Sequence, residues 1–361
     1  MKIVTVLGAR PQFVKASVVS RALALNETIS EVVVHTGQHF DDNMSEVFFR
    51  DLKMTKPKYH LEVHGGPHGE MTGRMLEAIE RVLLSERPDV VLVYGDTNST
   101  LAGALAAAKL CMPIAHVEAG LRSRNLRMPE EVNRILTDRI SRWLFTPTDA
   151  AFANLVREGV ASEAILPVGD VMFDVTLALS ALVEPFGGAL SEFGLKAHTY
   201  ALVTIHRAEN TDDIARLQII ADALCQFSSE IPLVWPVHPR TRNALDRAGL
   251  LDRLSKALVL LEPIGYLAMT QLEKYAALII TDSGGVQKEA FFHQVPCVTV
   301  RQETEWVELV DSGWNRLAPP TDVGSLVASL RAAPGSLGIE VQPYGAGDAA
   351  LRIARHLTST A

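Results

Sequence analysis

Short runs of β-branched apolar residues recur along this chain, and each is followed by a polar or glycine-containing loop and then by residues with helical spacing. In the first half, the runs that we expect to be strands cover 3–7, 32–35, 90–94 and 113–117. Continuous apolar runs that alternate with helices are typical of a parallel sheet covered on both faces. The pattern predicts an α/β fold with a doubly wound sheet.

The same alternation restarts in the second half, after a glycine-containing segment over 184–199 that we interpret as a loop. The expected strands there cover 201–205, 233–236, 258–261, 277–281 and 296–300. A length of 361 residues also fits two domains of about 150 residues each. The sequence therefore predicts two doubly wound α/β domains that are joined near 170–200.

The charge balance and the cysteines limit the partners and the compartment. The chain has 34 basic and 42 acidic residues, so its net charge is −8, and phosphate neutralisation by a nucleic-acid binder needs a basic face. The longest apolar run, 101–108, is shorter than the ~20 residues of a membrane helix. The cysteines at 111, 225 and 297 are far apart in apolar surroundings and lack metal-ligand spacing, as expected for buried free thiols in a reducing compartment. We expect a cytoplasmic protein with neither a nucleic-acid nor a membrane partner.

Charged and glycine-rich residues follow nearly every predicted strand. Ligands of open parallel sheets bind beyond the carboxyl ends of the strands. Because several such residues fall at equivalent places in both halves, we expect an active site in a cleft. The residues at these strand ends are Asp96, Glu118, His206, His238, Ser283 and Arg301.

Two segments have the composition of a phosphate site. Ser283, Gly284 and Gly285 precede a predicted helix over 286–292, where free N–H groups and the helix dipole favour an anion. A simple strand-to-helix turn with Ser283 as N-cap is the alternative. The segment is neither a Walker A loop nor a GxGxxG turn, so P-loop and nicotinamide-dehydrogenase assignments lose support. In the first loop, Arg10 and Lys15 have side chains suited to a phosphate, although lone cations are commonly solvated.

Carboxylates near the predicted strand ends suggest acid–base chemistry. Asp96, Glu118, Glu130 and Glu131, together with His206, could supply the divergent pKa values that proton transfer needs. The alternative is a salt-bridge network with nearby arginines, and for Glu131 we favour a helical pairing with Arg134.

A metal site is not expected. The chain has no HExxH or CxxC motif, and His64 and His68 lie among glycines in a segment that we interpret as a loop.

Several motifs, in order over essentially the whole chain, resemble the non-hydrolysing UDP-N-acetylglucosamine 2-epimerase family. No single motif is specific for this family, but the whole set is. The matching pieces are GARPQ (8–12) with Lys15, TGQHFD (36–41), VYGDTNSTLAGALAA (93–107), HVEAGLRS (116–123), PEEVNR (129–134), IHRAEN (205–210), PVHP (236–239), TDSGGVQKEA (281–290), TEW (304–306) and PYGAGDA (343–349).

The resemblance implies two Rossmann-like domains of the glycosyltransferase-B-like fold with a deep interdomain cleft. The first would cover 1–170 with a C-terminal helix over 345–361, and the second, UDP-binding domain would cover 171–344. The resemblance also implies a homodimer, and an enzyme that uses neither a metal nor a nicotinamide cofactor. The implied reaction inverts C-2 of a UDP-2-acetamido sugar: the C-2 proton is removed, UDP leaves to give a glycal, and UDP then re-adds with protonation on the other face.

The resemblance also implies roles for individual residues. The acid–base and oxocarbenium-stabilising set is Asp96, Glu118, Glu130 and His206. The set that holds UDP is Arg10, Lys15, Ser283, Gly284, Gly285 and Glu289, to which we add Arg301 at the strand edge. The positions that match an activating second UDP-sugar site of some bacterial members are Gln38, His39, Arg207 and His238.

This chain departs from the best-known branch of the family at Gln12, where that branch has Glu, and at Trp306, where it has Arg. Ile264 and Met269 also differ at the usual base-contacting positions. GARPQ with TEWVEL looks like the branch that acts on UDP-2,3-diacetamido-2,3-dideoxy-glucuronate for surface polysaccharide (O-antigen) synthesis. An uncharged Gln12 would repel an anionic sugar less, and Trp306 could pack against the sugar, although both changes could also only repack the cleft.

Three other activities remain open from the sequence. They are UDP-N-acetylglucosamine 2-epimerisation, a hydrolysing 2-epimerase, and a retaining glycosyltransferase of the same fold.

Overall fold

The computed structural model describes residues 1–38 and 54–359. The chain forms two compact units. Unit 1 consists of Met1–Val175 together with Gln342–Ala361, and unit 2 consists of Thr176–Val341. Each unit contains one sheet, and each is described below by itself.

The sheet of unit 1 has seven strands in the order β3-β2-β1-β4-β5-β6-β7. All neighbouring pairs are parallel, which confirms the predicted α/β class. Three strands were not predicted, namely β3, β6 and β7, because none of them is a continuous run of β-branched apolar residues. The strands are β1 (Lys2–Leu7), β2 (Ser30–His35), β3 (Tyr59–His60), β4 (Val90–Tyr94), β5 (Ile114–Val117), β6 (Trp143–Thr146) and β7 (Ile165–Pro167).

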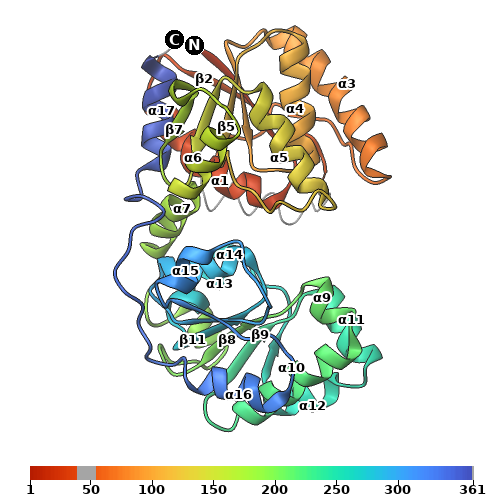
Figure 1. The fold of residues 1–361 in the computed structure, drawn as a ribbon, viewed down its shortest axis with the longest axis vertical. Helices are drawn as coiled ribbons and strands as arrows, with labels where there is room; N and C mark the ends of the chain where they lie inside the picture. Colours follow the sequence, from red (N-terminus) through yellow and green to blue (C-terminus); the bar gives the residue numbers. More distant parts are fainter. Residues whose placement is uncertain (39–53, 360–361) are drawn as a thin grey trace. The chain divides into compact units, whose positions relative to one another are not determined.

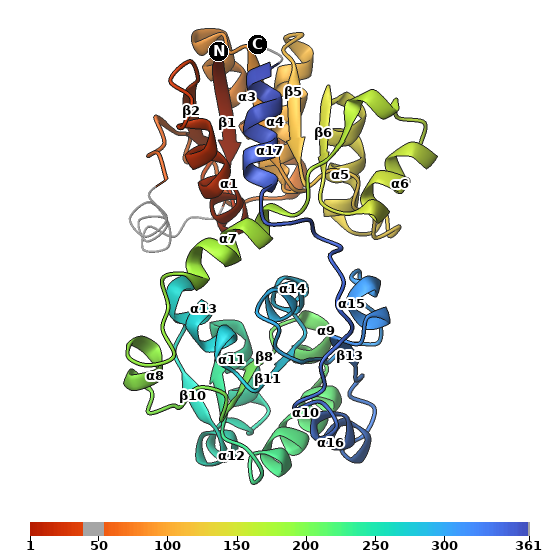
Figure 2. The ribbon, with the colours of Figure 1, turned by 90° about the vertical axis from the view of Figure 1, so that its left-hand side faces the viewer.

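Helices cover both faces of this sheet. On one face α1 and α17 lie side by side, although they come from opposite ends of the chain (Figure 2). Helices α3, α4 and α5 pack against one another in sequence order (Figure 1). The helices of unit 1 are α1 (Arg10–Leu23), α3 (His68–Glu86), α4 (Asn98–Lys109), α5 (Pro129–Ile140), α6 (Asp149–Arg157) and α17 (Ala349–Ser359), and α7 (Val171–Ser180) leads into unit 2.

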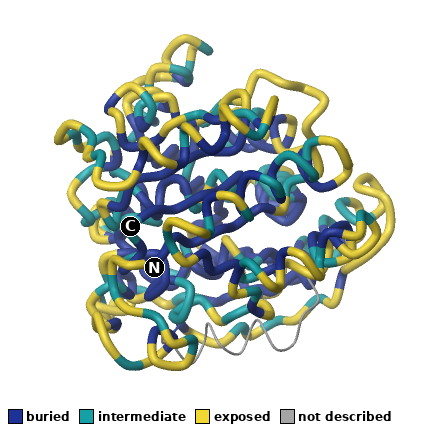
Figure 3. The backbone as a smooth tube through the Cα atoms, turned by 90° about the horizontal axis from the view of Figure 1, so that it is seen from below, coloured by how far each residue is buried: buried dark blue, intermediate teal, exposed yellow. Residues whose placement is uncertain are grey.

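Alternating side chains of the central strands build the core of unit 1. Val4 and Val6 of β1 pack with Met75 and Ile79 of α3 in one buried cluster. The small residues of α4 join the same cluster; at Gly103 an added Cβ would lie 3.2 Å from the Val6 side chain, so α4 can lie close to β1 only without a side chain there. The strands are buried along most of their length, whereas the connecting loops are exposed (Figure 3).

The sheet of unit 2 has six parallel strands in the order β10-β9-β8-β11-β12-β13. The strands are β8 (Ala201–Thr204), β9 (Leu233–Pro236), β10 (Val259–Leu261), β11 (Leu278–Thr281), β12 (Cys297–Thr299) and β13 (Asn315–Leu317). The helices are α8 (Gly188–Glu192), α9 (Ala208–Thr211), α10 (Ile214–Phe227), α11 (Pro239–Arg247), α12 (Leu251–Ala257), α13 (Tyr266–Lys274), α14 (Gly284–Phe292), α15 (Val307–Asp311) and α16 (Val323–Arg331).

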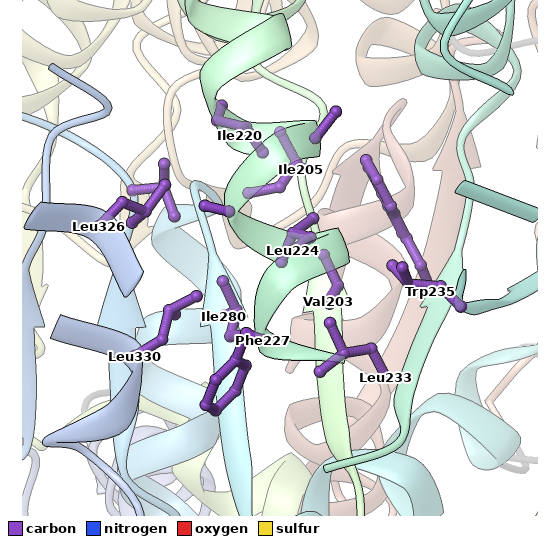
Figure 4. Packing of buried hydrophobic residues seen from close by; sticks show 14 of the residues in the cluster. Val203, Ile205, Ile220, Leu224, Phe227, Leu233, Trp235, Ile280, Leu326 and Leu330 are labelled. Atoms are coloured by element: carbon purple, nitrogen blue, oxygen red, sulfur yellow. The ribbon is translucent and has the colours of Figure 1, made fainter. Parts of the chain in front are cut away.

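Two apolar clusters lie on the two faces of this sheet. On one face Ile220, Leu224 and Phe227 of α10 point toward Val203 and Ile280 on the strands (Figure 4). The other face carries a second cluster in which residues of α8 and α13 pack against the strands. A sheet covered on both faces explains the continuous apolar runs in the sequence.

The segment 184–199 is not entirely the loop that we predicted, because it contains the short helix α8. Leu190 of α8 is buried in the second cluster, and the side-chain oxygen of Gln271 in α13 accepts a hydrogen bond from the backbone of Ala189. The burial of Leu190 and the hydrogen bond between Ala189 and Gln271 stabilise this short helix, and neither can be predicted from the local spacing of residues.

The order of the strands determines where a ligand-binding loop can lie in each unit. The strand order changes direction between β1 and β4 in unit 1 and between β8 and β11 in unit 2. Loops at such a reversal diverge and leave room for a ligand at the carboxyl ends of the strands. Arg10 begins α1 directly after the loop that follows β1, Asp96 lies in the loop after β4, and the loops after β8 and β11 carry His206 and Ser283.

No helix within residues 1–38 and 54–359 is long and apolar enough to cross a membrane.

Candidate active site

Gln12 fastens the loop after β1 to the end of β4. Its side-chain oxygen accepts hydrogen bonds from the backbone N–H groups of Gly8 (2.8 Å) and Ala9 (3.0 Å). Its side-chain nitrogen donates to the carbonyl oxygen of Tyr94 (2.8 Å) and to the Thr100 hydroxyl (2.9 Å). With 2% of its surface exposed, Gln12 is an internal brace. All four bonds are made inside unit 1, as the repacking alternative implies, whereas the expectation that the missing charge favours an anionic sugar stays a prediction.

We expect Gln12→Met to lower the free energy of unfolding by about 1–3 kcal/mol, because it leaves buried N–H groups without an acceptor. Urea unfolding checks this, with Gln226→Met on the exposed side of α10 as the matched control. The ratio of kcat/KM between two UDP-sugars should be unchanged. A normal stability with an altered sugar ratio would contradict the brace assignment.

Lys15 and Glu118 form an ion pair at the carboxyl ends of the central strands. Lys15 lies on α1 and not in the preceding loop as predicted, since the helix already begins at Arg10. Glu118 follows β5 in a left-handed conformation, with φ at 68°, which costs energy for a residue other than glycine and is common at functional sites. A Cβ at Gly95 would lie 3.4 Å from the Glu118 carboxylate and 3.8 Å from the Lys15 ammonium. The pair therefore lies directly over the loop that carries Asp96.

Asp96 and Glu131 share Arg134. The guanidinium lies 2.5 Å from the Asp96 carboxylate and also pairs with Glu131, which confirms the predicted pairing of Glu131. Burial opposes the ionisation of Glu131, but the backbone N–H groups of Ser123 and Arg124 and the Arg134 charge hold its pKa below the ordinary value. Asp96 remains partly exposed, with 32% of its side chain accessible, so it can reach a ligand while Glu131 cannot.

Glu130 lies in the first turn of α5 and is exposed. The helix dipole favours a negative charge at that end of the helix.

A buried network behind these loops was missed by the sequence analysis. His116, which is 0% exposed, has one ring nitrogen 2.8 Å from the Asp138 carboxylate and the other 2.7 Å from the carbonyl oxygen of Gly95. Burial opposes the ionisation of Asp138, but His116 and Arg122 hold its pKa below the ordinary value. The network fixes the turn before Asp96. The only signal of this network in the sequence was the position of His116 among the apolar residues of β5, and that pattern is also typical of an ordinary strand.

Two of the positions predicted for an activator or for UDP lie near this loop system. The side-chain oxygen of Gln38 accepts hydrogen bonds from the backbone N–H (3.0 Å) and hydroxyl (2.7 Å) of Ser99 in α4. Arg10 is the first residue of α1 and is half-buried. His39 lies outside the described residues. His68, which we predicted to lie in a loop, begins α3 and contacts Asn98 (3.1 Å) through Nδ1.

Asp282 organises the loop after β8 in unit 2, and the sequence analysis assigned it no role. It is 0% exposed and accepts hydrogen bonds from the backbone N–H groups of His206 and Arg207 and from the side chain of Asn210, each at 3.0 Å. An aspartate directly after a buried strand, as in LIITD, was the signal that could have found it.

His206 lies above Asp282 with 46% of its side chain exposed, and its Nε2 is 4.0 Å from the carboxylate. The His238 ring lies 6.4 Å away, between ring centres. Burial lowers the pKa of His206; Asp282 opposes this shift, and His238 and Arg207 add to it. At neutral pH the neutral imidazole is favoured, which is the form that accepts a proton.

Helix α14 begins at the predicted phosphate loop. Ser283 occupies the N-cap position without a capping hydrogen bond from its side chain, so the simple turn interpretation does not account for the serine. Gly284 and Gly285 are the first residues of the helix, where backbone N–H groups have no partner within a helix. A Cβ at Gly284 would lie 2.4 Å from a Glu305 oxygen and 3.3 Å from Trp306 Nε1. A side chain at this position would therefore have to displace the end of the Glu305 side chain.

Arg301 is engaged by carboxylates. With 9% of its side chain exposed, it lies 2.8 Å from Glu305 and 3.6 Å from Glu209. Burial opposes the ionisation of Glu305, but the Arg301 charge holds its pKa below the ordinary value. The pair fixes the position of Glu305 beside Gly284.

Trp306 is buried, with 7% exposed, and the ammonium of Lys288 lies 4.3 Å from the centre of its ring. Such a cation–π contact holds a cation in a largely buried place. The sequence analysis did not single out Lys288, although it stands within the TDSGGVQKEA motif.

The remaining predicted residues of unit 2 lie around these loops. Glu289 lies on α14 and accepts a hydrogen bond from the Tyr266 hydroxyl at 2.6 Å. Arg207 lies 3.5 Å from Glu305. His238 caps α11, its Nδ1 accepting a hydrogen bond from the backbone N–H of Arg240. Ile264 and Met269 pack partly buried against the second apolar cluster.

Within the part of the chain that the structure describes, no group of three or more His, Cys, Asp or Glu side chains is placed to hold a metal ion.

Both units contain a doubly wound parallel sheet. Unit 2 has a helix N-terminus suited to an anion, and unit 1 has carboxylates at the ends of its strands. This combination is typical of a nucleotide-binding α/β enzyme. The sequence model of the UDP-N-acetylglucosamine 2-epimerase family matches residues 21–358. The chain belongs to that family, and it is an isomerase that acts on a UDP-sugar.

Known relatives cover the whole chain. The chain is 53% identical, over 361 residues and 99% of both chains, to UDP-2,3-diacetamido-2,3-dideoxy-D-glucuronate 2-epimerase of Pseudomonas aeruginosa. It is 51% identical, over 88% of both chains, to a UDP-N-acetylglucosamine 2-epimerase homolog of Methanococcus maripaludis. The crystal structure of Methanocaldococcus jannaschii UDP-GlcNAc 2-epimerase in complex with UDP-GlcNAc and UDP superimposes with a TM-score of 0.89, at 43% identity, over 99% of this chain and 100% of the other. These similarities confirm the predicted Rossmann-like, glycosyltransferase-B-like class.

Proposed function

We propose that this enzyme inverts C-2 of UDP-2,3-diacetamido-2,3-dideoxy-D-glucuronate and gives the mannuronate epimer. The observation that carries the proposal is the 53% identity, over 99% of both chains, to a relative with that activity. UDP-N-acetylglucosamine is the second candidate, because a relative at 51% identity bears the corresponding name.

We assign the proton transfers to Asp96, Glu118, Glu130 and His206. A base removes the C-2 proton, the C–H electron pair forms the C1–C2 double bond, and UDP leaves with the electrons of the C1–O bond. UDP oxygen then re-attacks C1 while an acid delivers a proton to the opposite face of C-2. Glu118 beside Lys15 and the partly exposed Asp96 are placed for such transfers in unit 1. The lowered pKa of His206 suits a base in unit 2.

We assign UDP binding to Arg10, Lys15 and Arg301 and to α14 with Ser283. In α14, Gly285 and Glu289 are four residues apart and thus share one face of the helix. N–H groups at the first turn suit the diphosphate, and a carboxylate one turn further suits the two ribose hydroxyls, which are donors. The spacing along the helix therefore follows the order of groups in UDP.

The wider setting belongs to the same proposal. We infer a cytoplasmic homodimer that serves surface polysaccharide (O-antigen) synthesis without a metal or nicotinamide cofactor and without a nucleic-acid partner. The three cysteines are free thiols, as suits a reducing compartment; Cys297 is buried as expected, whereas Cys111 is exposed and Cys225 is only partly buried. We keep Gln38, His39, Arg207 and His238 as candidates for a second, activating UDP-sugar, and we propose domain boundaries near 170 and 345.

We expect the purified enzyme to incorporate solvent deuterium at C-2 of recovered UDP-sugar without an acceptor, and to prefer the diacetamido-glucuronate over N-acetylglucosamine by kcat/KM. Mass spectrometry and coupled rates check the two parts. Deuterium incorporation with equal or reversed preference would refute the sugar assignment alone. Release of free sugar and UDP would indicate the hydrolysing reaction, and acceptor-dependent transfer would indicate a glycosyltransferase.

A further inference from the structure

A second carboxyl group lies buried beside Glu289, in the contact between α13 and α14. Glu273 is 2% exposed, its Oε1 is buried without a hydrogen-bond partner among the described residues, and its carboxyl group adjoins that of Glu289. Tyr266 and Glu273 are seven residues apart on α13, and Glu289 of α14 is four residues before His293, the residue that caps the end of that helix. These spacings place each pair on one face of its helix, so the two helices meet through these four side chains.

No cation balances Glu273 among the described groups that face it. The nearest ring nitrogen of His293 is 3.9 Å away, and burial with the neighbouring Lys274 charge lowers the pKa of His293 to about 4, so this imidazole is neutral at pH 7. The Lys274 ammonium donates to the carbonyl oxygen of Ser180 at 2.7 Å. The Tyr200 hydroxyl donates to the carbonyl oxygen of Leu272 at 2.6 Å.

A buried carboxylate without a counter-charge, beside a second carboxylate, is unstable relative to its protonated form. Burial, followed by the charge of Glu289, raises the pKa of Glu273 well above its ordinary value. Glu273 therefore carries a proton at neutral pH. A carboxylic acid is a donor, whereas an ionised carboxylate only accepts.

We propose that Glu273 is a positioning residue which, as a neutral acid, donates its proton in a hydrogen bond to Glu289 and holds that carboxylate ready to accept the ribose hydroxyls of UDP. The Tyr266 hydroxyl donates to Oε1 of Glu289 at 2.6 Å. Two O–H donors then fix the orientation of the carboxylate. The inference rests on the assignment of Glu289 to UDP above.

The test compares the binding of UDP and 2′,3′-dideoxy-UDP at pH 7 by calorimetry. The wild type should bind UDP at least about tenfold more tightly, as one hydrogen bond to a charged group provides. Glu273→Gln keeps an N–H donor and should preserve this preference within about twofold. Glu273→Leu lacks a donor and should lose about tenfold in UDP affinity while its dideoxy-UDP affinity stays unchanged. Glu192→Leu, on the exposed side of α8, is the matched control.

Infrared spectra give a second readout that does not depend on the fold of the leucine variant. In the difference spectrum between the wild type and Glu273→Gln at pH 7, a carboxylic-acid C=O band should be present for the wild type and lost in the variant. Any one of three results would overturn the positioning role of Glu273 but not the assignment of Glu289 to UDP. The band is missing, Glu273→Leu keeps the preference for UDP over dideoxy-UDP, or Glu273→Gln loses that preference. If the wild type and Glu289→Gln both bind the two nucleotides equally, Glu289 does not hold the ribose, and the UDP assignment fails with it.

Discussion

Glu118→Gln should fold as the wild type does and lose epimerisation by about 10²–10⁴-fold in kcat, the usual effect of removing a positioned acid or base. The amide keeps the size of the side chain, so the left-handed turn at Glu118 and the packing over Gly95 should persist. What disappears is the negative charge beside Lys15 and the ability to exchange a proton. Asp96→Asn should give a loss of the same order.

Turnover and deuterium incorporation at C-2 separate the possible roles. A variant that still exchanges the C-2 proton but does not turn over has kept the base and lost another step. Glu77→Gln on the exposed side of α3 is the matched control, because its carboxylate pairs with Arg81 one turn away on the surface. Near-native rates in both Glu118→Gln and Asp96→Asn would show that the catalytic set has been assigned to the wrong carboxylates.

The fold could be predicted because its main signal is local. Buried parallel strands must be apolar on both faces, so strands such as β4 and β11 are visible as unbroken runs. Short edge strands such as β3 and β13 have two or three residues and carry no such run. Their place is set by pairing with neighbours far along the chain.

The position of the site could also be predicted, but the partner of each side chain could not. Residues at the carboxyl ends of parallel strands meet at one edge of each sheet, so Asp96 and Glu118 were found by location. The brace made by Gln12, by contrast, joins residues more than 80 positions apart. Asp282 likewise serves a loop over 70 positions away. Contacts between residues so far apart in the sequence depend on how whole helices pack. The spacing of residues within one segment does not determine that packing.

Gly284→Val should weaken UDP binding by about 10²-fold, as the loss of one or two charge-assisted hydrogen bonds of about 1.5–3 kcal/mol each requires. A Cβ at this position would lie 2.4 Å from Glu305. To make room, the Glu305 carboxylate, with 35% of its side chain exposed, would have to leave its 2.8 Å ion pair with Arg301. The branched side chain would also occupy the place where a phosphate approaches the first N–H groups of α14.

The neighbouring glycine provides the matched comparison for this site. A Cβ at Gly285 would meet only the Ser283 hydroxyl, at 3.9 Å. Gly285→Ala should therefore leave the melting temperature nearly unchanged, whereas Gly284→Ala already places its Cβ against Glu305. Ser283→Ala should reduce UDP affinity only a few-fold, because the hydroxyl makes no capping bond that the helix would lose. Calorimetric titration with UDP, beside thermal melts, distinguishes a blocked ligand from a disturbed fold. Unchanged UDP affinity in a folded Gly284→Val variant would mean that the diphosphate does not bind at the start of α14.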